Sequence, residues 1–386
     1  MEEWKTYTLS ELSKGKGNYG IAASAVPYNP DLYTYLRITD INDDGTLNKS
    51  GMMSVDGNNA KDYLLKPNDI VFARTGNSTG RSYFYDGSDG ELVFAGFLIK
   101  FSLDEKKVNP RILKYFTHSK PYYDWVKSFD TGGTRGNINA KTYGDMPIVL
   151  PSRTTQDRIV EVMKSLDDKI DCNCRINDNL QHQAQALYKS WFVDYEPFKD
   201  GEFVESELGM IPKGWRLGTL GEILEIKYGK DHKKLSDGII PVYGSGGLMR
   251  YAEKPLYEGE SVLIPRKGTL NNVMYVNEAF WTVDTMFYTI PKMQNSILFA
   301  YILLSNKDLA SMNSGSAVPS MTTEILNNIQ IVMPVSDVLA EFNRLVSAYY
   351  AQIKHYDQET RRLAQLRDAI LPRLMSGELK IDEVTV

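Results

Sequence analysis

Hydrophobic residues recur three and four positions apart in two long stretches of the chain, which is the spacing of a helix that packs along a seam. One stretch runs from Ile159 to Trp191 and the other from Phe342 to Leu374, so each covers 33 residues. Spacing of this kind over more than four heptads is typical of coiled-coil packing. We therefore predict two long helices that pack against each other. The alternative, in which each helix only lies on its own domain, explains less well why both stretches keep the seam over the same length.

The predicted seam is mostly hydrophobic, with a few polar interruptions. Its positions include Ile159, Leu166, Ile170, Asn173, Asn177, Leu180 and Leu187 in the first helix, and Phe342, Tyr349, Ile353, Tyr356, Leu363, Ile370 and Leu374 in the second. Asn173 and Asn177 interrupt one helix, and Thr360 and Arg367 interrupt the other. A polar seam residue costs stability but can fix the register and orientation of a helix pair. These residues are either such register pins or part of a hydrated seam.

The chain contains an internal duplication. Residues 131–170 align with residues 314–353 at a constant offset of 183, and Pro151 falls on Pro334. The segments before these ranges also match, with small changes of offset where loops differ in length. Long-period similarity of this kind indicates a duplicated structural unit.

Each half therefore consists of an α/β domain followed by a long helix, and the fold class is α+β with a pseudo-two-fold internal repeat. Short runs of β-branched and aromatic residues, such as 69–74 and 327–333, predict strands. A polar, proline-containing segment between the halves is typical of a connector. The predicted segments are a first α/β domain over 1–151, a helix over 152–193, a connector over 194–213, a second α/β domain over 214–334, and a helix with a tail over 335–386.

Composition narrows the possible functions. A formal net charge of −5 argues mildly against indiscriminate binding of nucleic acid, although local clusters decide this. Cys172 and Cys174 would point about 200° apart on a helix, so we expect neither a disulfide nor a shared metal, and we expect a reducing cytoplasm. No stretch approaches about 20 consecutive apolar residues, and the first residues do not look like a signal peptide. We therefore expect no membrane association.

Several loops are rich in residues that suit contact with DNA and poor in acids. Recognition of DNA needs donors for phosphates and side chains that reach base edges, and glycines allow close approach of the backbone. In the first domain the candidates are Arg74, Thr75, Gly76, Asn77, Thr79, Arg81, Gly132, Gly133, Thr134, Arg135 and Asn137. In the second domain they are Lys227, Tyr228, Lys230, Lys233, Lys234, Arg266, Lys267, Asn271, Asn272, Ser314 and Ser316. The alternative for each loop is an ordinary polar turn or a solvated charged loop.

The sequence lacks the signatures of catalysis. Residues 76–80 have neither the spacing nor the lysine of a phosphate-binding loop, and residues 244–247 lack the context of a dinucleotide fingerprint. The four histidines are scattered and lie near no cluster of cysteines or acids, so we predict no catalytic residue and no metal site. A stand-alone enzyme is therefore disfavoured, and we expect any chemistry to come from partner proteins.

The order and spacing of several segments resemble the specificity subunits of type I restriction–modification enzymes. Residues 35–45 (YLRITDINDDG) and 69–82 (DIVFARTGNSTGRS) resemble the first half of such subunits. Residues 190–198 (SWFVDYEPF) resemble their central region, and residues 366–379 (LRDAILPRLMSGEL) their second half. No single piece is a sharp motif, and the match is specific because of the order, the spacing and the duplication together.

This resemblance implies two target recognition domains, held apart by two long antiparallel helices, each reading one half of a bipartite, asymmetric site in double-stranded DNA. It implies two modification subunits that assemble around the chain and methylate adenines with S-adenosylmethionine. Restriction subunits that use ATP and Mg²⁺ can join them. The chain itself would bind no cofactor and would work in the cytoplasm of a bacterium or archaeon.

Two alternatives stay open. The chain could be the specificity subunit of another multisubunit restriction system, which only the neighbouring subunit would distinguish. It could instead be a protein-interaction scaffold, a class against which the near absence of acids in the candidate loops argues modestly.

Overall fold

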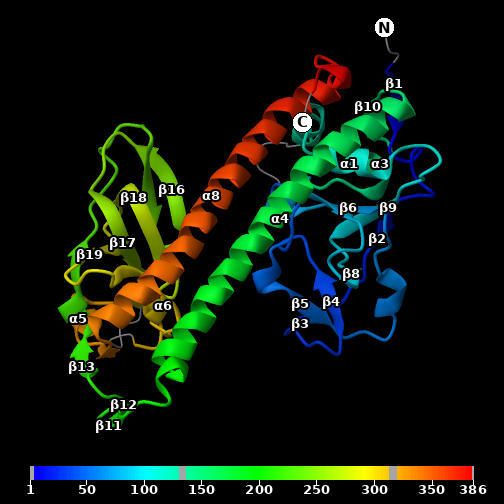
Figure 1. Cartoon of the computed structure of the whole chain (residues 1–386). Helices are drawn as coiled ribbons and strands as arrows, with labels where there is room; N and C mark the ends of the chain where they lie inside the picture. The colour runs from blue at the N-terminus through cyan, green and yellow to red at the C-terminus, as the bar shows by residue number, and fades with distance from the viewer. Residues whose placement is uncertain (1–3, 130–135, 313–319, 385–386) are drawn as a thin grey trace. The chain divides into compact units, whose positions relative to one another are not determined.

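The computed structural model describes residues 4–129, 136–312 and 320–384 (Figure 1). The chain divides into two compact units. The first unit contains Met1–Asp171 and Thr360–Val386, and the second contains Cys172–Glu359. Each unit therefore comprises one α/β domain together with part of each long helix.

The first α/β domain is built from two four-stranded sheets and a closing strand pair. One sheet has the order β2 (Asn18–Tyr19), β9 (Leu98–Ser102), β6 (Asp69–Ala73), β7 (Ser82–Tyr85). The other has the order β3 (Ala25–Val26), β5 (Met53–Val55), β4 (Tyr33–Leu36), β8 (Leu92–Phe94). The helices of this domain are α1 (Pro110–Phe116), α2 (Lys120–Lys127) and α3 (Ala140–Gly144).

The second α/β domain contains one six-stranded sheet. Its order is β14 (Leu224–Tyr228), β19 (Met286–Pro291), β17 (Tyr257–Pro265), β18 (Met274–Thr282), β15 (Ile240–Gly244), β16 (Gly247–Ala252). The helices are α5 (Leu220–Ile223), α6 (Ile297–Ser305) and α7 (Thr323–Asn327). The two domains thus share strand-and-helix content but differ in how their sheets are divided.

Both domains begin and end on one antiparallel strand pair. In the first domain β1 (Lys5–Thr8) pairs with β10 (Pro147–Leu150), and in the second β13 (Arg216–Thr219) pairs with β20 (Gln330–Met333). Because the first and last strands of each domain lie side by side, each domain is closed at its junction with the long helices. The strands β10 and β20 are the segments that the internal duplication aligns.

Aromatic side chains form the centre of the first domain's core. Phe72 of β6 stacks on Tyr143 of α3, with ring centroids 4.7 Å apart. The Tyr143 hydroxyl donates to the carbonyl oxygen of Ala73 at 2.9 Å, and the buried Tyr122 hydroxyl donates to that of Gly80 at 2.6 Å. Buried hydroxyls need such partners. These bonds hold both ends of the loop between β6 and β7, which is the first predicted DNA-contact loop.

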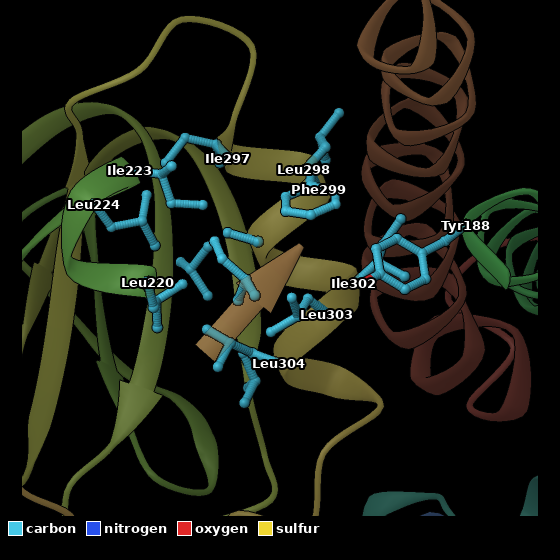
Figure 2. Close-up of a cluster of buried hydrophobic side chains, with 14 of the residues drawn as sticks. Tyr188, Leu220, Ile223, Leu224, Ile297, Leu298, Phe299, Ile302, Leu303 and Leu304 are labelled. Carbon is cyan, nitrogen blue, oxygen red and sulfur yellow. The ribbon is translucent and has the colours of Figure 1, made fainter. Parts of the chain in front are cut away.

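In the second unit, α6 joins the sheet to the long helices. Its residues are apolar around nearly the whole helix, which is typical of a buried helix. Figure 2 shows these side chains between the strands and Tyr188. Phe299 of α6 lies 4.9 Å from Phe192, which lies 4.8 Å from Phe342, measured between ring centroids. Burying an aromatic ring of this size contributes about 1.5–3 kcal/mol, so the cluster anchors the domain to the helices.

The two long helices are α4 (Arg153–Phe192) and α8 (Ser336–Met375). None of the predicted seam residues is exposed. Those that are buried are Ile159, Leu166, Asn173, Asn177, Leu180, Phe342, Ile353 and Leu374. Those that are half-buried are Ile170, Leu187, Tyr349, Tyr356, Leu363 and Ile370.

The polar seam residues bond across the helix pair. Asn173 Nδ2 donates to Glu359 at 2.8 Å, and Asn177 Nδ2 donates to Asp357 at 2.7 Å and to the Ile353 carbonyl oxygen at 3.4 Å. Residue numbers rise along α4 as they fall along α8, so the helices are antiparallel. Buried amides that bond across a pair are the arrangement expected of register pins.

Arg367, the polar interruption near the end of α8, pairs with Asp167 of α4 at 3.1 Å. Asp167 also accepts hydrogen bonds from Lys114 at 2.7 Å and from the Tyr115 hydroxyl at 3.1 Å. Burial alone would raise the pKa of Asp167, but Lys114 and Arg367 outweigh it and hold that pKa below its ordinary value. This carboxylate therefore ties the first domain to both long helices.

We expect Asp167→Asn to lower the free energy of unfolding by about 1–3 kcal/mol near neutral pH, because two cations lose their anionic partner. The pKa of Asp167 is lower in the folded chain than its ordinary value of 3.8, so the unfolded chain takes up the proton first. The stabilisation is therefore fully present above about pH 4 and declines as the pH falls further. Urea unfolding between pH 6 and pH 3.5 measures the difference in free energy of unfolding between wild type and variant. Asp178→Asn, at an exposed position of α4, is the matched control. A difference in free energy of unfolding between wild type and Asp167→Asn that stays constant with pH would contradict the role given to Asp167.

The segment predicted as a connector contains regular secondary structure. It contains a short 3-10 helix (Glu196–Phe198) and a hairpin of β11 (Phe203–Ser206) and β12 (Gly209–Pro212). Phe198 packs edge-on against Trp215, with ring centroids 5.1 Å apart. Contacts of this kind between distant positions leave no periodic pattern in the sequence.

Among the described residues, no helix combines the length and apolar character needed to cross a membrane.

Candidate nucleic-acid interface

The two predicted DNA-contact loops of the first domain meet. Thr75 forms an isolated antiparallel bridge with Asn137, and the Ile138 amide donates to the Arg74 carbonyl oxygen at 3.0 Å. The Thr79 hydroxyl donates to the carbonyl oxygen of Gly136 at 3.0 Å. The loop after β6 and the segment before α3 therefore form one surface. The predicted residues Gly132, Gly133, Thr134 and Arg135 lie outside the described residues.

The second domain repeats this junction. Lys267 forms an isolated antiparallel bridge with Ser320, and the Met321 amide donates to the Arg266 carbonyl oxygen at 2.9 Å. Met321 is the residue that the offset of 183 aligns with Ile138, so the same backbone bond occurs in both domains. The predicted residues Ser314 and Ser316 lie outside the described residues.

An arginine–tyrosine pair stands at this junction in each domain. The Arg74 guanidinium lies 5.0 Å from the centre of the Tyr19 ring, and that of Arg266 lies 5.4 Å from the centre of the Tyr228 ring. Both tyrosines are exposed at the end of a strand. Stacked guanidinium–aromatic contacts of this kind are attractive and keep the plane of the arginine fixed.

Tyr19 was not predicted as a site residue, although the sequence holds a signal for it. Tyr19-Gly20 and Tyr228-Gly229 are the same dipeptide at corresponding places in the duplication. A Cβ on Gly20 would lie 2.2 Å from the Phe94 carbonyl oxygen, and one on Gly229 would lie 2.0 Å from that of Val283. Only glycine allows the backbone to lie this close to a carbonyl oxygen, so equivalent close packing after each tyrosine fixes where the tyrosine lies.

A sequence model of the family described as the type I restriction modification DNA specificity domain matches residues 1–182 and 212–355. The chain belongs to this family. It is 28% identical over 301 residues to the MjaIX specificity subunit of Methanocaldococcus jannaschii, covering 70% of this chain and 69% of that subunit. It is 23% identical to the HindI specificity subunit of Haemophilus influenzae, covering 98% and 100%.

The fold also matches a solved structure. The crystal structure of a type I restriction–modification S subunit from M. genitalium has a TM-score of 0.60 and 17% identity, covering 97% of this chain and 96% of that one. This similarity shows the fold. The predicted resemblance to type I specificity subunits, with its α/β domains and long helices, is confirmed.

Several of the predicted DNA-contact residues form hydrogen bonds or ion pairs with other residues of the chain. Arg81 donates to Asp43 at 2.7 Å and to the Ile41 carbonyl oxygen at 3.0 Å. Asn271 donates to Asp308 and Asn272 to the Ser245 carbonyl oxygen, while Lys227 pairs with Glu225. The hydrogen bond with Glu225 raises the pKa of Lys227. Asp43 and Asp308 reach these loops from distant positions and Glu225 is a neighbour of Lys227, so the low acid content of the loops does not leave them free of acids.

Other predicted residues are exposed. These are Asn77, Asn137, Lys230, Lys233, Lys234 and Lys267. Lysine is a flexible point charge that suits phosphates, whereas the stacked arginines offer a planar pair of donors. Each domain therefore carries an arginine that suits base edges, and the second domain adds exposed lysines that suit the DNA backbone.

A cavity of about 290 Å³ lies beside the first loop, lined among others by Asn77, Arg81, His118 and Tyr123. Burial lowers the pKa of His118 although Asp44 lies near it, so the imidazole is neutral near pH 7. Among the described residues, no group of three or more His, Cys, Asp or Glu side chains is placed to hold a metal ion. Arg81 is therefore the cation beside this cavity, and its ion-pair partner Asp43 also lines the cavity.

Proposed function

We propose that this chain is the DNA-reading subunit of a type I restriction–modification complex, and that each α/β domain reads one half of a split, asymmetric site in double-stranded DNA. The observation that carries this proposal is the repeated junction. In both domains an arginine after a buried strand stacks on an exposed tyrosine and accepts the same backbone hydrogen bond. Two copies of one donor-rich surface suit two separate half-sites.

We assign the chemistry to partner proteins. Two methyltransferase subunits would dock on the chain and use S-adenosylmethionine to methylate adenines in the cytoplasm. Where restriction subunits join, they would use ATP and Mg²⁺. The long helices would set the distance between the half-sites, because each carries residues of both units.

The partner-free chain should show no methyltransferase activity, whereas its complex with the modification subunits should methylate a split site. Incorporation of labelled methyl groups into plasmid DNA measures both, with the modification subunits alone as the control. Methylation by the purified chain without partners would contradict the proposal. Methylation by the modification subunits alone, with the same sequence preference as the complex, would also contradict it.

A further inference from the structure

The arginine–tyrosine pairs each contain a half-buried arginine whose guanidinium makes few hydrogen bonds to the rest of the protein. Within the described residues, neither Arg74 nor Arg266 forms an ion pair with a carboxylate. Arg74 Nε is buried without a hydrogen-bond partner, and Arg266 makes one long bond, from Nη1 to the Asp284 carbonyl oxygen at 3.3 Å. A charged donor that is partly removed from water and left unsatisfied is costly, which points to an acceptor supplied by a ligand.

Each tyrosine orients its arginine and so determines which arrangement of ligand acceptors the arginine can bind. Tyr19 is 42% exposed and Tyr228 is 52% exposed, and the guanidinium carbon of the partner arginine lies over each ring, so both pairs stand at the surface of their domains. A guanidinium stacked on a ring keeps the donors at its edge directed outward in one plane. Two parallel N–H groups in that plane match the O6 and N7 atoms of guanine in the major groove.

We propose that Tyr19–Arg74 and Tyr228–Arg266 are two equivalent guanine-reading sites, one in each domain, in which the tyrosine is a positioning residue for the arginine. This inference rests on the proposed function and adds to it one guanine in each half-site. The exposed lysines Lys230, Lys233, Lys234 and Lys267 are left to contact phosphates, for which a flexible point charge suffices.

The test uses the complex with its modification subunits and a library of DNA in which each half-site position is varied. Arg74→Lys keeps the charge but loses the planar fork. It should reduce discrimination for guanine at one position about 5- to 150-fold, with little change in affinity for unrelated DNA. Arg266→Lys should do the same at one position of the other half-site only.

The positioning role is tested with the tyrosines. Tyr19→Leu removes the ring and should reduce the same discrimination about 2- to 30-fold. Tyr19→Phe keeps the ring and loses only the exposed hydrogen bond from the Ala140 amide to the Tyr19 hydroxyl, so it should stay within about twofold of wild type. The double variant Tyr19→Leu, Arg74→Lys should be no worse than Arg74→Lys alone, because the ring acts through the arginine. Tyr28→Leu, at a tyrosine of the same domain that is 60% exposed, is the control and should change nothing.

Three outcomes would overturn the inference while the wild-type complex still recognises its split site. Equal loss of affinity for all sequences would show a phosphate contact. Equal effects of Tyr19→Leu and Tyr19→Phe would show that the ring does not orient the arginine. Single substitutions that perturb both half-sites would show that the two pairs are not separate sites. A wild-type complex without sequence preference would instead overturn the proposed function.

Discussion

Inserting four residues into each long helix, after Asn177 in α4 and after Ile353 in α8, should lengthen the preferred spacer between half-sites by one or two base pairs. Asn177 and Ile353 face each other across the pair, so matched insertions keep the helices aligned. Four residues add about 6 Å at 1.5 Å per residue, and DNA rises about 3.4 Å per base pair. An insertion of this length disturbs a heptad seam only locally. The half-site sequences should stay the same, because no recognition loop is changed.

Mapping the sites methylated by the variant complex measures this spacer directly. The control is an insertion of the same four residues after Glu207, in the exposed turn of the β11–β12 hairpin, which should leave the spacer unchanged. Thermal unfolding must show that both variants are folded. A folded helix variant with an unchanged spacer, or with changed half-site bases, would show that the helices do not set the distance.

Replacing residues 220–329 with the corresponding segment of the HindI specificity subunit should exchange one half-site and leave the other intact. The segment suits exchange because its ends adjoin: Thr219 pairs with Gln330, and the Leu220 amide donates to the Ile329 carbonyl oxygen at 2.9 Å. Recognition of the lost half-site should fall about a thousandfold or more, because specific and non-specific binding differ by at least that much.

The methylated sites of the chimera, its parent and the donor complex are compared in parallel. The matched control exchanges residues 9–146, which lie between β1 and β10 of the first domain, and should alter only the other half-site. A chimera that changed both halves, or neither, would contradict one domain for each half-site.

The helices and the duplication could be predicted from the sequence because both leave periodic signals. Ile159, Leu166, Phe342 and Leu374 are buried where the seam spacing placed them. Ile138 and Met321, which the offset of 183 aligns, make the same backbone bond in the two domains. Local spacing along a helix and a constant offset between copies need no knowledge of distant contacts.

The details of the interface could not be predicted in the same way, because they depend on contacts between distant segments. Arg81 looked available within its own loop, but Asp43 reaches it from 38 positions earlier. Asn271 likewise bonds Asp308, which is 37 positions later. The repeated Tyr-Gly dipeptide is too short a signal to predict a site by itself, and the contact of Tyr19 with Arg74 makes it a candidate.

The most direct test of split-site recognition is to map every methylated adenine in a genome exposed only to this chain and its modification subunits. We expect one asymmetric motif with two short specified halves, separated by a spacer of fixed length and unspecified sequence, with a guanine in each half. Changing Arg266 should relax one half and leave the other half and the spacer intact. A single continuous motif, or methylation without sequence preference, would contradict the central claim that two domains of this chain read two separate half-sites.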